Sequence, residues 1–285
     1  MKNKEELLKD FKKANSARKL KLAEKNGFTT TNEYLEFLQG KRKTSKKKEE
    51  KVVMDYVICF DTTGSMGSYI NDVKKHVKDL IPDMFSKGMD LYMRIVAFGD
   101  YCDMKSKNDF GNAYQESEFT NNENELINFV NNAKNTSGGD EDEFYELVIK
   151  KITEETPWRE GSKRVVLFIA DSNTHKVGYS YNQIVTDAQV DWRKEAKKAA
   201  ELNISFDTLA IHGDRYPWYK GLSSLTNGVN MPFKSTNKMN EVFTASAYVR
   251  GSSASKASFS AKMAEVTADG DEELIGTYKS LSKLL

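Results

Sequence analysis

The sequence predicts an α/β fold, namely a doubly wound, mostly parallel sheet with one antiparallel edge strand and helical extensions at both ends. Continuous apolar runs occupy residues 52–60, 91–98, 165–170 and 204–211. Such runs are typical of strands buried on both faces, as in parallel sheets. Segments with helical periodicity lie between them, and this alternation indicates βαβ units with right-handed crossovers.

The elements follow one another in a regular order. We expect strands at 52–60, 91–98, 118–120, 165–170, 204–211 and 229–233, with 118–120 as the antiparallel edge. We expect helices at 70–84, at 126–133, from about 144, and at 181–202, 218–225 and 237–248. The first helix is the clearest, because its apolar residues recur at spacings of three and four.

The N-terminal 50 residues form a basic arm. Residues 1–51 hold 16 Lys/Arg and 8 Asp/Glu, a net charge of +8, whereas the remainder holds 27 and 34, a net charge of −7. Thr30 and Glu33 predict a capping box at the start of a short helix. The charge run at residues 41–51 predicts a linker. The arm is either a flexible extension or a tether for nucleic acid or another polyanion, since phosphate contacts need only clustered Lys/Arg. It has no recognisable nucleic-acid-binding module.

The C-terminal segment 249–285 lies outside the predicted α/β domain, which covers residues 51–248. Five serines within residues 251–260 predict a flexible linker. Apolar residues from Leu274 to Leu285 share one helical face. This helix either docks on its own domain or offers a handle to a partner's groove.

Cysteine usage and hydropathy bear on the compartment. Cys59 and Cys102 are the only cysteines, so no disulfide framework is expected, which fits a reducing environment. The N-terminus lacks the apolar stretch of a signal peptide, and no run approaches the roughly 18 apolar residues of a membrane span. We therefore expect a soluble cytoplasmic protein without a membrane contact.

Oxygen-bearing side chains follow two of the predicted strands. Asp61, Thr63 and Ser65 come directly after the first strand, and Asp171 ends the strand 165–170. Adjacent parallel strands would bring both groups to the carboxyl edge of the sheet, where open α/β sheets hold ligands. Hydroxyl and carboxylate oxygens suit a hard cation, so we expect Mg²⁺, or Mn²⁺ or Ca²⁺ in its place.

These residues resemble the metal-ion-dependent adhesion site (MIDAS) of the von Willebrand factor A (vWA) family, a Rossmann-like fold. The family's Asp-x-Ser/Thr-x-Ser loop corresponds to Asp61, Thr63 and Ser65, and its third-loop Asp to Asp171. The segments AFGDYCD (97–103), SGGDEDE (137–143) and IADSNTH (169–175) resemble the vWA domains of alpha-kinase-like proteins. The resemblance spans about residues 52–248. Residues 249–285 are too few for a kinase domain.

Many members of the family carry a Thr where Asp140 stands, after the two glycines, but the branch with the GGDE spelling has Asp there. The resemblance therefore assigns the second-loop ligand to Asp140, with Thr136 as the alternative. The acids 140–142 could instead favour the dipole at the start of the next helix. A third carboxylate would neutralise the ion more fully, so adhesion-type binding is less assured here than in members with Thr.

The resemblance implies a cation-dependent protein-binding module, whose ion is completed by an Asp or Glu from a partner. The alternative is a structural or assembly component, in which the ion stabilises only the loop and the terminal segments make the contacts.

We expect no enzyme. A haloacid-dehalogenase-type phosphotransferase needs a second acid where Thr63 stands. A nucleotide-binding domain needs a richer glycine loop, and a hydrolase needs a nucleophile elbow. His175 is assigned either to loop hydrogen bonding or to the rim of the metal site. Cys59 is expected to be inert core, and nothing near Cys102 would activate its thiol.

Overall fold

The structure, a computed structural model, describes residues 4–26, 28, 30–41, 51–211, 213, 215–233 and 238–285. The chain divides into two compact units, residues 1–51 and 52–285. Most of the predicted charged linker (42–50) and the start of the last predicted helix (237) lie outside the described residues.

The N-terminal unit contains three short helices: α1 (Lys4–Lys13), α2 (Ser16–Lys25) and α3 (Thr31–Leu38). They share a small core of buried apolar side chains, namely Phe11, Ala23, Phe28, Tyr34 and Leu38. The capping box is confirmed: Thr30 Oγ1 accepts from the Glu33 amide at 3.2 Å, and Glu33 Oε2 accepts from the Thr30 amide at 3.3 Å. The arm therefore has its own packed core, which its sparse apolar residues did not suggest.

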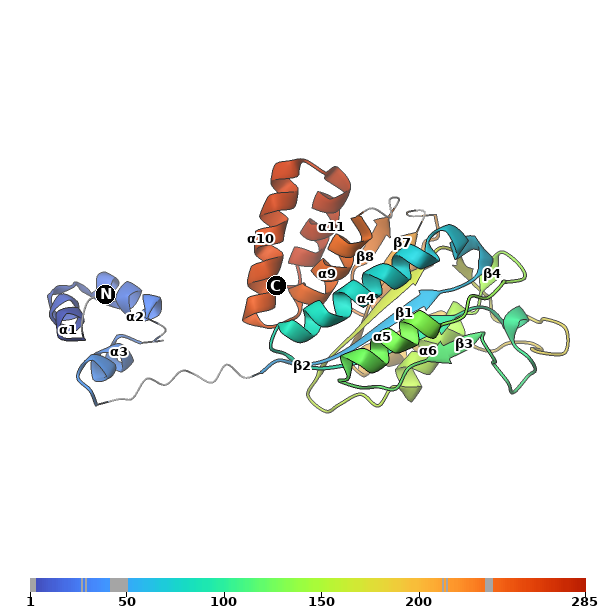
Figure 1. The fold of residues 1–285 in the computed structure, drawn as a ribbon, viewed down its shortest axis with the longest axis horizontal. Coiled ribbons are helices and arrows are strands. Elements are labelled where there is room, and N and C mark those ends of the chain that lie inside the picture. Colours follow the sequence, from blue (N-terminus) through green and yellow to red (C-terminus); the bar gives the residue numbers. More distant parts are fainter. Residues whose placement is uncertain are drawn as a thin grey trace. The chain divides into compact units, whose positions relative to one another are not determined.

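The second unit is built on a six-stranded sheet (Figure 1). Its order is β3 (Tyr114–Glu116), β2 (Asp90–Phe98), β1 (Val53–Asp61), β5 (Lys163–Ala170), β7 (Ile204–Ile211) and β8 (Asn230–Phe233). Only the β2–β3 pair is antiparallel. The predicted fold class is thus confirmed. The edge strand precedes the expected 118–120, of which Thr120 makes only an isolated antiparallel bridge to Met93.

Helices cover both faces of this sheet. One face packs against α4 (Ile70–Ser86), α5 (Glu123–Asn132) and α9 (Met239–Val249). The other packs against α6 (Tyr145–Glu155), α7 (Trp192–Glu201) and α8 (Trp218–Leu225). Strand β1 alternates between the two cores, with Ile58 on the first side and Cys59 on the second, both fully buried. Burial on both faces explains the unbroken apolar run.

Helix α7 begins at Trp192, later than the expected start at 181. Asp191 caps it by accepting a hydrogen bond from the Arg193 amide at 2.9 Å. Within the preceding segment Asn182 and Asp187 have φ of 49° and 52°, a left-handed conformation that does not occur within right-handed helices. Residues 181–190 therefore form a loop that precedes the helix.

The serine-rich segment expected as a linker forms helix α10 (Ser253–Asp269), followed by α11 (Glu272–Ser282). Ser252 caps α10 by accepting from the Ser255 amide at 3.2 Å. The Ser258 hydroxyl donates to the carbonyl four residues back, so it is satisfied inside the helix. Phe259 and Tyr278 stack with ring centroids 5.2 Å apart and join the core around α9. The C-terminal helices therefore dock on their own unit.

Among the described residues, no helix combines the length and apolar character needed to cross a bilayer.

The docking of α10 can be tested at Phe259, which is 1% exposed. Phe259→Ala should lower the free energy of unfolding by about 3 kcal/mol, the usual cost of truncating a buried Phe. Leu285→Ala, at a side chain 53% exposed, is the control and should change it by less than about 0.5 kcal/mol. Urea denaturation measures both. Equal midpoints for Phe259→Ala and wild type would contradict the docking.

Candidate metal centre

The loop after β1 is held by the carboxylate that ends the strand. Asp61 is fully buried, and its Oδ1 accepts hydrogen bonds from the Thr63 amide and the Thr63 hydroxyl, both at 2.7 Å. The Gly64 amide donates to the Ser137 carbonyl at 3.1 Å. A Cβ on Gly64 would lie 2.9 Å from that oxygen, so only glycine allows this approach. The first loop is thereby fixed against the loop that carries the acidic SGGDEDE segment.

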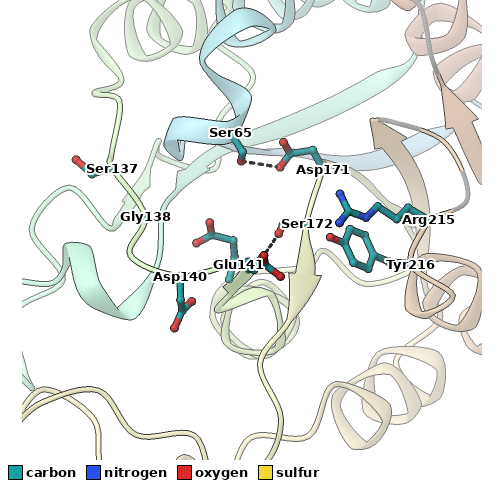
Figure 2. A pocket seen from close by; sticks show the side chains of 10 residues that line it. Ser65, Ser137, Gly138, Asp140, Glu141, Asp171, Ser172, Arg215 and Tyr216 are labelled. Atoms are coloured by element: carbon teal, nitrogen blue, oxygen red, sulfur yellow. Dashed lines mark hydrogen bonds between the residues drawn. The ribbon is translucent and has the colours of Figure 1, made fainter.

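Asp171 lies beside this loop because β5 pairs with β1 in parallel register, Ile169 opposite Phe60. Ser65 Oγ donates to Asp171 Oδ1 at 3.1 Å (Figure 2), and the Thr63 and Ser65 hydroxyls are 3.3 Å apart. One chain of hydrogen bonds therefore joins Asp61, Thr63, Ser65 and Asp171. The structure brings these four predicted residues together, and their role as metal ligands stays a prediction.

The second loop is arranged differently from the expectation. Asp140 Oδ2 accepts from the Tyr179 hydroxyl at 2.8 Å, and its carboxylate groups with Asp100 and His175. Thr136, the alternative ligand, hydrogen-bonds through its hydroxyl to that of Thr62 at 2.9 Å. Among the described residues, neither side chain hydrogen-bonds to Asp61, Thr63 or Ser65.

Glu143 is the second-loop acid that lies against this chain. It ends β4 (Asp142–Glu143), a two-residue strand that pairs in parallel with β6 (Asn173–Thr174). Glu143 is 3% exposed. Burial raises the pKa of its carboxyl group, and a hydrogen bond from the Thr63 side chain offsets part of that rise. Glu143 is not among the ligands predicted from the sequence, although it is the last acid of SGGDEDE before the buried Phe144 and Tyr145.

Burial and mutual repulsion raise the pKa of two of these carboxyl groups. The pKa of Asp61 rises to about 7, first through burial and then through the charge of Asp171. The pKa of Glu143 rises to about 11, through burial and then the charges of Asp61 and Asp100. Glu143 Oε2 has no hydrogen-bond partner within the described ranges. Burial and neighbouring charge thus disfavour the ionised form of both carboxyl groups, and a bound cation would relieve this cost by favouring the carboxylates.

Buried aromatic side chains position the Asp61 carboxylate. The Tyr145 hydroxyl donates to Asp61 Oδ2 and accepts from the Ser172 amide at 3.3 Å. Its ring is fully buried and packs against Phe98, Phe168 and Trp218. Tyr145 therefore fixes the Asp61 carboxylate and ties it to the loop after β5.

The cluster opens onto a cavity of about 290 Å³ (Figure 2). Oxygen-bearing side chains from three loops line it, with a cation and a phenol from the loop after β7: Ser65, Glu143, Asp171, Ser172, Arg215 and Tyr216. Arg215 is exposed. The cavity thus combines a carboxylate cluster with an exposed guanidinium.

The cysteines make no disulfide. Both thiols are free; Cys59 is buried and Cys102 partly buried, and burial raises the pKa of each thiol. A raised pKa disfavours the nucleophilic thiolate.

Comparison with known proteins gives a fold and one distant relative. No family model matches the chain. A putative ariadne-like RING finger protein of Acanthamoeba polyphaga mimivirus is 21% identical over 200 residues, covering 67% of this chain and 19% of that protein. The chain therefore spans about a fifth of the length of the curated relative it matches.

Solved structures share the fold of the second unit at low identity. The pilus adhesin SpaC of Lactobacillus rhamnosus GG, in its open conformation, matches with a TM-score of 0.51 and 12% identity over 70% of this chain and 30% of that one. Proximal thread matrix protein 1 from the mussel byssus matches with a TM-score of 0.50 and 12% identity, over 70% of this chain and 47% of that one. At such identities the likeness concerns the fold alone.

Proposed function

We propose that this chain is a divalent-cation-dependent protein-binding module of the vWA type, whose ion is completed by an acidic side chain of a partner. The chain of hydrogen bonds from Asp61 through Thr63 and Ser65 to Asp171 carries this proposal. It brings two hydroxyls and two carboxylates together at one edge of the sheet. Oxygen donors of this kind are what Mg²⁺ prefers.

In this proposal Glu143, in place of Asp140, supplies the second-loop carboxylate. Its unpartnered Oε2 and raised pKa both indicate a group that would gain from a nearby positive charge. Three acids around one ion would leave it less able to attract a fourth. The exposed guanidinium of Arg215, on the same cavity, offsets this by offering hydrogen-bond donors to an incoming carboxylate.

The ion would supply one strong, directional contact for an outside oxygen, and the chain's own residues do the rest. Asp61 and Tyr145 hold the loop, while Ser65 and Asp171 keep the two strand ends together. Arg215 and Tyr216 border the position at which a partner would enter. One structural neighbour is named a pilus adhesin, so a binding role is compatible with this fold. The cysteine count supports an intracellular setting.

A second candidate function is attachment through the N-terminal unit. Residues 1–51 carry a net charge of +8 and contain a core of their own, so they could bind a polyanion such as nucleic acid. The ion would then only stabilise its loop. A salt titration of DNA binding by the full chain and by a variant lacking residues 1–51 separates the two functions.

Mg²⁺ should stabilise the protein against unfolding. At a concentration of about 100 times Kd, binding to the folded state alone adds about 2.7 kcal/mol, and EDTA should remove this gain. Ser65→Ala should lose most of it, because an exposed hydroxyl ligand is removed while the fold is kept. Asp140→Asn is the control and should keep it. Thermal unfolding with Mg²⁺ and with EDTA measures each effect.

Equal stabilisation of wild type and Ser65→Ala by Mg²⁺ would contradict the assignment of the ion to this cluster.

Partner capture should depend on the cation. Immobilised protein should retain a partner in Mg²⁺ and lose it in EDTA, and Ser65→Ala should lose it in both buffers, because the contact runs through the ion. Deletion of residues 1–51 should leave capture unchanged. Retention in EDTA by wild type and Ser65→Ala alike, together with loss on deletion of residues 1–51, would show that the terminal segment makes the contact.

A further inference from the structure

We propose that Asp100, Asp140 and His175 form a second cation site, separate from the Asp61–Asp171 cluster and suited to a transition ion such as Zn²⁺ or Mn²⁺. Each residue comes from a different segment: AFGDYCD, SGGDEDE and IADSNTH. One ligand atom from each lies within 4.8 Å of the other two. The site does not depend on the binding function proposed above.

Two of the three side chains are buried and fixed. Asp100 is fully buried, and its Oδ2 accepts from the Cys102 amide at 3.3 Å. His175 is 4% exposed, and its Nε2 lies 2.7 Å from Asp100 Oδ1. The His175 amide donates to the Glu143 carbonyl at 3.2 Å, as a continuation of the β4–β6 pair. Buried groups held in this way need little reorganisation to bind an ion.

Tyr179 positions the third ligand. Its hydroxyl donates to Asp140 Oδ2 at 2.8 Å, and its ring stacks on the His175 ring with centroids 3.6 Å apart. Hydrogen bonds and stacking contacts of this kind orient metal ligands and tune their affinity. One aromatic residue therefore holds both the exposed carboxylate and the buried imidazole.

A simple ion pair between His175 and Asp100 explains only part of the arrangement. The contact pairs the imidazole of His175 with one carboxylate, that of Asp100. It leaves Asp140, whose carboxylate is held close to that of Asp100, where like charges repel.

Glu143 lies beside this cluster as well, because its carbonyl accepts from the His175 amide at 3.2 Å. Its buried Oε2 has no hydrogen-bond partner in the described part of the chain. One residue with an unsatisfied buried oxygen thus joins the two clusters, and a cation in either cluster would supply the positive charge that this oxygen lacks.

The donor set determines the class of ion. Imidazole nitrogen suits Zn²⁺ and other transition ions, whereas Mg²⁺ and Ca²⁺ favour oxygen alone. Three protein ligands leave a position for water or for a ligand from outside. The site borders a cavity of about 460 Å³, which Lys176, Val177 and Gly178 also line. An ion could therefore enter from solvent.

The test is a titration of the full chain with Zn²⁺ in saturating Mg²⁺. Calorimetry measures the affinity, and NMR records the ¹⁵N resonances of the histidine rings during the titration. The His175 signals, assigned with His175→Gln, should shift on binding of one Zn²⁺. Asp140→Asn should weaken this binding at least about 10-fold, since loss of even an indirect contact to a metal costs that much. Asp140 is exposed, so this variant should keep the fold.

Glu141→Gln removes the same charge from the next exposed residue and should bind Zn²⁺ as wild type does. Ser65→Ala should also bind Zn²⁺ with the affinity of wild type. Loss of the cation site at Ser65 is thereby distinguished from loss of the site at Asp100, Asp140 and His175. Unshifted His175 signals at saturating Zn²⁺, or unchanged affinity in Asp140→Asn, would overturn the second site.

Discussion

The convergence of buried carboxylates at the carboxyl edge of the sheet is the constraint on which the site depends. Asp61 and Asp171 end adjacent parallel strands, and Ser65 bridges their loops through its bond to Asp171. Their repulsion, together with burial, raises the pKa of Asp61 to about 7. A fold that keeps such groups together without a counter-charge loses stability, and a bound cation restores it.

The short β4–β6 pair distributes the acids of the second loop between two clusters. Its parallel register sets Glu143 opposite Thr174 and leads directly to the His175 amide. Glu143 then approaches Thr63, while Asp140, three residues earlier, remains with His175 and Tyr179. The pairing of this two-residue strand thus explains why Asp140 and Glu143, two acids of one motif, lie in different clusters.

Much of the fold followed from the sequence, because strands buried on both faces leave unbroken apolar runs. The meeting of Asp61 with Asp171 followed from the same logic, since neighbouring parallel strands end at one edge. The position of Asp140 beside Tyr179 and of Glu143 beside Thr63 did not follow, because the tertiary pairing that places them leaves no periodic pattern. Helix α10 was missed because its serines satisfy their hydroxyls within the helix and its packing rests on a few residues such as Phe259.

The most direct test of a cation at this edge is an anomalous difference map from crystals grown with Mn²⁺ in a buffer that contains no Mg²⁺. A cation bound at this edge should give a peak within coordination distance, about 2.1 Å, of Ser65 Oγ and close to the carboxylates of Asp171 and Glu143. A well-ordered map with no peak among Thr63, Ser65 and Asp171 would contradict the central claim that this edge of the sheet holds a cation.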